Sequence, residues 1–149
     1  MSGMSQEEAR REVQALLYRI SELENYINQL NSTLNALLRE IEEIRLARSA
    51  IDAVKETKDV SVLIALDRRG HVFAQGTVTS GDKFITHIGS EYYALLPPEK
   101  TLKILDEKEN DLRKAITTVQ TELSKASKLY ENLQRTLATL AEASRQKGS

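Results

Sequence analysis

The sequence predicts an α+β protein: a long antiparallel two-helix coiled-coil hairpin with two β-hairpins, four short strands in all, at its bend. The interior glycines and both prolines all lie between residues 70 and 98. The flanking segments are rich in Leu, Glu, Lys, Arg, Ala and Gln, a composition typical of long helices. We therefore expect an N-terminal coiled-coil helix in residues 1–55, a β-hairpin oligomerisation insert in 56–97 and a C-terminal coiled-coil helix in 98–149.

The first helical segment has apolar residues at alternating spacings of three and four. They are Val13, Leu16, Ile20, Leu23, Ile27, Leu30, Leu34, Leu37, Ile41, Ile44 and Ile51, with Arg48 at the one polar step. A seven-residue period sustained over this length predicts a left-handed supercoil. Each arm would be on the order of 65 Å long at about 1.5 Å per residue.

The second helical segment repeats this pattern. Its positions are Leu102, Leu105, Glu109, Leu112, Ile116, Val119, Leu123, Ala126, Tyr130, Leu133, Leu137 and Leu140. The matched lengths favour pairing of the two helices with each other. The predicted register places Leu37 opposite Ile116 and Val13 opposite Leu140, as an antiparallel coiled coil requires.

Two polar residues interrupt the apolar seam in neighbouring layers of this register. Arg48 faces Leu105, and Glu109 faces Ile44. We expect Arg48 and Glu109 to reach each other and to help fix the register, because a polar seam residue trades stability for specificity. The alternative is that each lies at a frayed or widened end of the coil beside the β-segment.

The middle segment changes to the two-residue period of strands. Strands are expected at residues 60–66, 71–79, 84–88 and 91–96, and Gly89–Ser90 suits a two-residue type II′ turn. Isolated hairpins are marginal in water, and open sheet edges invite pairing with other chains. We therefore favour sheet-to-sheet assembly over folding back onto the helices. The expected assembly residues are Val62, Ile64, Leu66, Val72, Phe73, Val78, Phe84, Ile85, Ile88, Tyr92 and Tyr93.

Charge and composition exclude several partners. A net charge of −1 gives no reason to expect nucleic acid or an anionic membrane. An RNA-binding coiled-coil arm would need a basic stripe, whereas residues 7–12 interleave both signs. No apolar run approaches the roughly 20 residues of a membrane span, and the first residues lack the apolar core of a signal peptide. A soluble, cytoplasmic protein is expected.

No pattern in the sequence indicates catalysis. There is no phosphate-binding glycine loop and no cysteine, and His71 and His87 are the only histidines. The acidic cluster at residues 40–43 lies on a predicted helix and is most simply a solvated face. A two-helix hairpin offers no cleft for a carboxylate pair. We expect no enzyme, no metal and no cofactor.

The middle segment resembles the alpha-class subunit of prefoldin. The resemblance is strongest at residues 62–66 (Val-Leu-Ile-Ala-Leu), 70–76 (Gly-His-Val-Phe-Ala-Gln-Gly) and 88–93 (Ile-Gly-Ser-Glu-Tyr-Tyr), and it extends over nearly the whole chain. Four strands indicate the alpha class, since beta-class subunits have a single hairpin. Glu91 departs from the family pattern, which commonly has a second glycine there.

This resemblance implies a hexamer of two alpha and four beta-class prefoldin subunits. Its hairpins would form a double β-barrel, and its coiled-coil tips would hold non-native polypeptides without ATP and deliver them to a group II chaperonin. The alternative is a structural scaffold of the gamma-prefoldin type, which forms filaments through its β-hairpins. The expected client-binding residues at the tips are Val13, Leu16, Leu17, Tyr18, Ile20, Leu133, Leu137 and Leu140.

Overall fold

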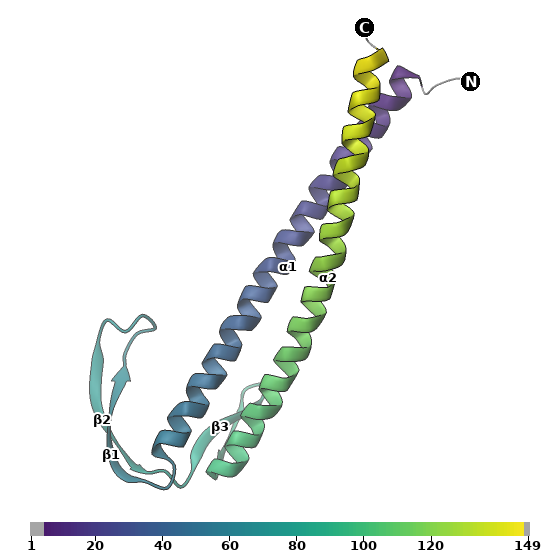
Figure 1. Ribbon diagram of the computed structural model, residues 1–149. Helices are drawn as coiled ribbons and strands as arrows, with labels where there is room; N and C mark the ends of the chain where they lie inside the picture. Colours follow the sequence, from purple (N-terminus) through teal and green to yellow (C-terminus); the bar gives the residue numbers. More distant parts are fainter. Residues whose placement is uncertain (1–4, 148–149) are drawn as a thin grey trace. The chain divides into compact units, whose positions relative to one another are not determined.

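The computed structural model describes residues 5–147, and its elements follow the predicted order (Figure 1). They are α1 (Gln6–Val54), β1 (Lys58–Ala65), β2 (Phe73–Ser80), β3 (Phe84–Gly89), β4 (Tyr92–Leu96) and α2 (Pro98–Lys147). Two long antiparallel helices pack together, and two two-stranded antiparallel hairpins lie between them in the chain, so the expected fold class is confirmed.

The chain divides into two compact units. One unit contains the helical segments up to Leu38 and from Lys114, and the other contains Arg39–Arg113 with both hairpins. We call them the end unit and the hairpin unit.

Local sequence sets where each helix begins and ends. Ser5 Oγ accepts a hydrogen bond from the Glu8 amide at 3.1 Å, as an N-cap residue does, before α1 begins. Beyond the end of α1, Glu56 has a φ of 62°, the left-handed conformation that often follows a helix. Pro98 starts α2, where its missing N–H costs no helical hydrogen bond.

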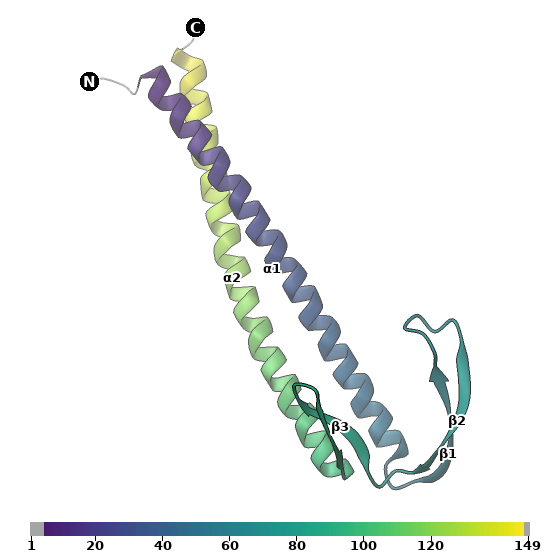
Figure 2. The same ribbon diagram turned by 180° about the vertical axis from the view of Figure 1, so that it is seen from behind.

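In the end unit, α1 and α2 lie side by side, as both views show (Figures 1 and 2). Ile20, Ala126 and Leu133 are buried, and the other apolar seam positions are half-buried. Most residues between them are exposed. A pair of helices has a single seam, so among the described residues no side chain is completely excluded from solvent.

In the hairpin unit, β1 pairs with β2 in a regular register that includes Val60 with Val78 and Val62 with Gly76. Along β2, half-buried and exposed side chains alternate strictly. Figure 2 shows the second hairpin beside the first turns of α2. There the buried hydroxyls of Thr86 and Thr101 lie 2.8 Å apart and share a hydrogen bond.

The predicted turn between β3 and β4 is wrong by one residue. The loop is Ser90–Glu91, and Gly89 belongs to β3, where it pairs with Tyr92. The register shifts between His87 and Gly89, which makes Ile88 the extra residue of a β-bulge. This extra residue moves the turn, and Ser90 in the loop has a left-handed φ of 48°, next to Gly89 with a φ of 153°.

Candidate assembly and client-binding surfaces

An ionic network links the two helices of the hairpin unit around Glu109. Its carboxylate accepts hydrogen bonds from Arg45 Nε and Arg48 Nη2, both at 3.1 Å, and from Arg113 Nη2 at 3.4 Å. Arg48 Nη2 also donates to Asp106 at 2.6 Å. The structure thus places the predicted pair of Arg48 and Glu109 in contact. The two arginines and the aspartate around them were not foreseen, because they lie outside the seam positions.

The arginines hold Glu109 ionised although the residue is buried. Arg45 has the largest effect, and together with Arg48 and Arg113 it lowers the pKa of Glu109 below its ordinary value, against the opposing effect of burial. Arg48 Nε is buried and has no hydrogen-bond partner among the described residues. Buried charges are stable only when they are paired, so removal of Glu109 would leave arginine charge without its carboxylate partner.

Two tyrosine–glutamate hydrogen bonds join the helices of the end unit. Tyr26 donates to Glu122 at 3.2 Å, and Tyr130 donates to Glu24 at 2.6 Å. Partial burial and the Glu122 carboxylate raise the pKa of Tyr26, and the hydrogen bond to Glu24 raises that of Tyr130. Both phenols are therefore protonated donors at neutral pH.

Most apolar side chains of the two hairpins lie exposed. Of the expected assembly residues, Val62, Val78 and Phe84 are half-buried. The exposed ones are Ile64, Leu66, Val72, Phe73, Ile85, Ile88, Tyr92 and Tyr93. Leu63 and Leu95 are exposed as well and were missed, although both stand in apolar strand runs that could have indicated them. Apolar surface of this extent on both hairpins is typical of an interaction site.

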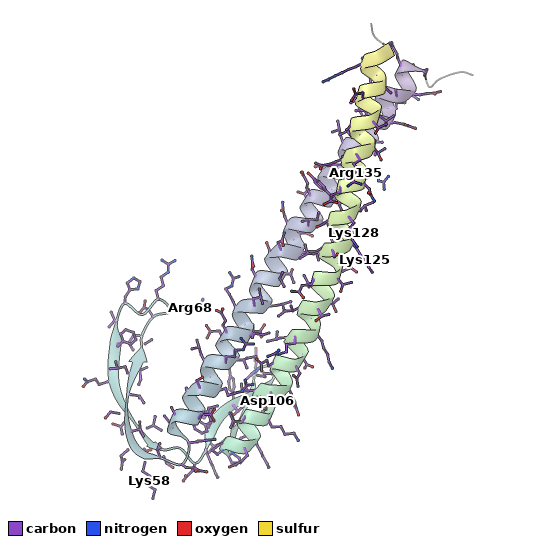
Figure 3. All side chains as sticks on the ribbon, in the orientation of Figure 1. Lys58, Arg68, Asp106, Lys125, Lys128 and Arg135 are labelled. Atoms are coloured by element: carbon purple, nitrogen blue, oxygen red, sulfur yellow. The ribbon has the colours of Figure 1, made fainter. Side chains whose placement is uncertain are left out.

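The loop between β1 and β2 is ordered by Asp67. Its carboxylate accepts hydrogen bonds from the amides of Arg69, His71 and Val72 and contacts His71 Nδ1 at 2.6 Å. Among these contacts, the His71 side chain contributes most to lowering the pKa of Asp67. Figure 3 shows Arg68 at this loop, with Lys58 at the other end of β1 and Asp106 on α2. The loop is thus held by this carboxylate and by the Leu66 amide, which donates to the Val72 carbonyl at 2.9 Å, and its arginines lie exposed.

The two histidines have local structural contacts. His87 Nε2 lies 2.6 Å from the Ser90 carbonyl oxygen, and its Nδ1 lies 3.2 Å from Lys108 Nζ. His71 contacts Asp67 in the loop just described. Within residues 5–147, no group of three His, Asp or Glu side chains is arranged to hold a metal ion. In the same range, no helix is both long and apolar enough to cross a membrane.

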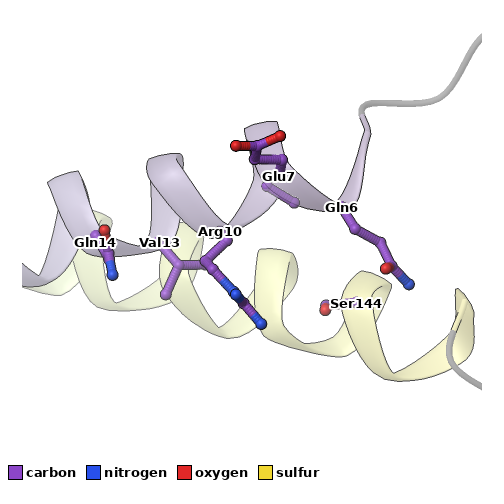
Figure 4. A pocket seen from close by; sticks show the side chains of 7 residues that line it. Gln6, Glu7, Arg10, Val13, Gln14 and Ser144 are labelled. Carbon is purple, nitrogen blue, oxygen red and sulfur yellow. The ribbon is translucent and has the colours of Figure 1, made fainter.

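At the free ends of the helices, the expected client-binding residues differ in exposure. Leu17 and Tyr18 lie outside the seam and are exposed. Val13, Leu16, Leu137 and Leu140 are half-buried, whereas Ile20 and Leu133 are buried. Figure 4 shows an open space between the helix ends. Its volume is about 910 Å³, and it is lined by Gln6, Glu7, Ala9, Arg10, Val13, Gln14 and Ser144. Val13 therefore lies among mostly polar neighbours, and Tyr18 does not line this space.

Exposed apolar residues at a second groove of the end unit were missed. Tyr26 and Leu129 lie just outside the seam, on α1 and α2 respectively, and are partly exposed. The heptad pattern places both residues beside the seam, but only the structure shows that they lie close to each other. Both line a groove with Tyr18 and Leu133.

Comparison with known proteins identifies the chain's relatives. The family model of the prefoldin subunit matches residues 7–143. The prefoldin subunit alpha of Saccharolobus islandicus strain Y.N.15.51 is 31% identical over 97% of this chain and 99% of its own length. That of Sulfurisphaera tokodaii is 30% identical over 87% of each chain.

Among solved structures, the cryo-EM structure of filamentous PFD from Methanocaldococcus jannaschii aligns with 83% of this chain and 95% of its own. Its TM-score is 0.46 and its sequence identity 18%, a likeness that does not bear on function. The match to the family model and the full-length relatives settle the family. The chain belongs to the prefoldin family, as an alpha subunit of these non-enzymatic chaperones.

Proposed function

We propose that this chain acts in the cytoplasm, within a hexamer of two alpha and four beta-class prefoldin subunits. The hexamer holds non-native polypeptides at its coiled-coil tips without ATP and delivers them to a group II chaperonin. The exposed apolar surface of both hairpins carries the assembly part of this proposal, since no other part of the described chain covers it. Pairing with other subunits would remove that surface and the unpaired strand edges from water.

The client-binding part depends on the free ends of the helices. Leu17 and Tyr18 are exposed there, and the half-buried Val13 and Leu140 would become accessible when the last helical turns fray. Local opening near helix ends costs little free energy. Several arms that each bind an unfolded chain weakly would jointly bind it tightly, because linked weak contacts add avidity.

Aggregation of a heat-denatured model protein, followed by light scattering without nucleotide, tests the holding activity. The chain is first mixed with a single-hairpin prefoldin partner, and the assembly is verified by its mass. Suppressed aggregation at near-stoichiometric amounts is expected. An assembled mixture that leaves aggregation unchanged would contradict the proposal.

The double variant Leu17→Ser with Leu137→Ser tests the location of client binding. It should assemble normally yet suppress aggregation poorly, since it removes one exposed and one half-buried apolar side chain near the helix ends. Loss of assembly in this variant would instead place the two residues in a structural role.

We also propose that the pair of Arg48 and Glu109 helps to fix the register of the two helices. The 3.1 Å contact between Arg48 Nη2 and Glu109 Oε2, with Arg45 on the same carboxylate, supports this role. Replacement of both residues by Leu should stabilise the helix pair and loosen its register. Disulfide trapping between cysteines engineered along the two helices would then yield several registers, and an unchanged trapping pattern would refute the proposal.

A filament-forming scaffold of the gamma-prefoldin type is the second candidate. It is favoured by the same observation, because both hairpins have unpaired edges that could continue in an open series. Mass measurement separates the two candidates: a closed particle of defined mass supports the hexamer, and an open-ended series supports the filament.

A further inference from the structure

The two flanks of the helix pair in the end unit are chemically different. Each flank has a groove where side chains just outside the seam of α1 meet those of α2. One groove, here called the apolar flank, is lined by Tyr18, Arg19, Glu22, Leu23, Tyr26, Leu129 and Leu133. The other, here called the polar flank, is lined by Glu24, Ile27, Asn28, Ser127, Tyr130, Glu131 and Gln134.

The apolar flank presents hydrocarbon surface to water. Tyr26 is 41% exposed and Leu129 is 43% exposed, and the buried Leu133 lies between the helices beneath them. The hydroxyl of Tyr26 is engaged by Glu122, so its ring is the part available to a ligand. The groove has a volume of about 350 Å³, near the lower end for small-ligand pockets.

The charges of the groove do not select a charged ligand. Arg19 and Glu22 contribute one charge of each sign, and neither has an ion pair among the described salt bridges. The side chains of Leu23, Leu129 and Leu133 offer no hydrogen-bonding group. A polypeptide backbone lying on them would lose its hydrogen bonds to water without replacement. The groove therefore suits individual apolar side chains whose backbone stays in solvent.

The size of the groove argues against a folded partner or a second copy of the chain. Seven residues line it, whereas a stable protein interface uses roughly 20–30 residues on each side. Weak, repeated capture of single side chains needs no more than such a groove provides, because the affinity comes from several arms acting together.

We propose that the apolar flank binds aliphatic and aromatic side chains of non-native polypeptides, and that the polar flank does not. The inference rests on the proposed holdase function. It adds the location of the client site on the helix pair and the kind of side chain that binds there. Client contact thus extends inward from Tyr18 and Leu133 along one side of the helix pair, to Tyr26 and Leu129. The client-binding residues at the helix ends thus continue into the apolar flank.

Photo-crosslinking from two neighbouring positions of α2 tests the inference directly. Benzoylphenylalanine is placed at Leu129, on the apolar flank, or at Ser127, on the polar flank, in the assembled complex with a single-hairpin partner. Reduced and carboxymethylated α-lactalbumin serves as the permanently unfolded client. At least fivefold more client adduct is expected from position 129. Equal yields, or adducts from position 129 only with a second copy of this chain, would overturn the inference.

Matched leucine variants provide a functional readout. Leu129→Ser should weaken suppression of aggregation about fivefold. Leu38→Ser should change it less than twofold, although Leu38 is similarly exposed at 45%, because it lies outside this groove. Circular dichroism verifies that both variants keep their helices.

The outcomes distinguish this inference from the holdase function itself. No effect of Leu129→Ser, together with a weakened Leu17→Ser and Leu137→Ser double variant, would refute the apolar flank and leave the holdase function standing. A wild-type complex that fails to suppress aggregation would refute both.

Discussion

The two hairpins have the same strand count but are attached to the helices in different ways. The β3–β4 hairpin is tied to α2 by side chains, through Thr86 with Thr101 and His87 with Lys108. The β1–β2 hairpin is joined to the end of α1 through backbone: the Thr57 amide donates to the Val54 carbonyl at 3.2 Å, and the Gly81 amide donates to the Thr57 carbonyl at 3.0 Å. Side-chain contacts fix the position of the β3–β4 hairpin on α2. The β1–β2 hairpin is connected at its base, which leaves both of its faces accessible.

This comparison predicts that a single substitution has the larger effect at the backbone connection of the β1–β2 hairpin. A Cβ at Gly81 would lie 1.9 Å from the Val54 carbonyl oxygen, a contact that only movement of the backbone can relieve. Gly81→Ala should therefore destabilise the pairing of β1 and β2 by about 3 kcal/mol or more. Hydrogen exchange of their amides would accelerate by roughly a hundredfold, since about 1.4 kcal/mol corresponds to a factor of ten.

The neighbouring substitution Asp82→Ala serves as the control, because Asp82 is exposed. It should change the exchange rates little. If exchange in Gly81→Ala matched the wild type, the backbone joint would not hold this hairpin.

Substitutions in the side-chain contact between β3 and α2 should have a smaller effect, and the effects of the Thr86 and Thr101 variants should be coupled. Thr86→Val or Thr101→Val alone should each cost about 1 to 2 kcal/mol, because the remaining buried hydroxyl loses a partner. The double variant should cost less than the sum of the two, since two apolar groups can pack where two hydroxyls met. Urea unfolding of the four proteins measures this cycle, and strict additivity would show that the contact is incidental.

The turn of β3 and β4 is a site where the hairpin can be strengthened. Ser90 has a φ of 48°, which costs most residues about 1–2 kcal/mol but is free for glycine. Ser90→Gly should stabilise the protein by about 0.5 to 1 kcal/mol, after the greater flexibility of glycine in the unfolded chain is subtracted. Ser90→Ala also removes the hydroxyl but keeps the Cβ, and it should give no gain in thermal unfolding. Equal stabilisation by both variants would exclude the backbone explanation.

Acid should loosen the two hairpin loops to different extents. The contact with His71 lowers the folded-state pKa of Asp67 below its ordinary value of 3.8. Its stabilisation of the β1–β2 loop is present above that value and is lost as the pH falls through the lower, folded-state pKa. The Ser90–Glu91 loop has no described carboxylate accepting its amides and should respond less.

Amide chemical shifts of residues 69–72 and 89–92, followed by NMR from pH 6 to pH 2, measure this difference. Asp67→Asn should remove the acid response of the first loop. A first-loop response that persists in Asp67→Asn would assign it to another group.

The sequence by itself determined the helix pair. A seven-residue apolar period gives each helix one face to bury, and the matched lengths of the two helices favour burying these faces against each other. Ile20, Ile41, Ile44 and Ile51 are buried as that period requires. Three cross-helix contacts, Tyr130 with Glu24, Arg45 with Glu109 and Arg48 with Asp106, lie within one residue of the predicted register. The strand pattern likewise indicated two hairpins, and the motif of residues 62–93 indicated the family.

Tertiary structure alone decided what depends on contacts between residues distant in the chain. The bulge at Ile88 moved the turn from Gly89–Ser90 to Ser90–Glu91, because the extra residue shifts the pairing of β3 with β4. Arg45 and Asp106 became partners of the Arg48–Glu109 pair only when the helices were in register. The difference between the two flanks arose in the same way, since residues such as Tyr26 and Leu129 form one groove only after both helices are in place. Periodicity specifies which face of a helix is buried, but it does not specify which side chains meet at the edge of that face.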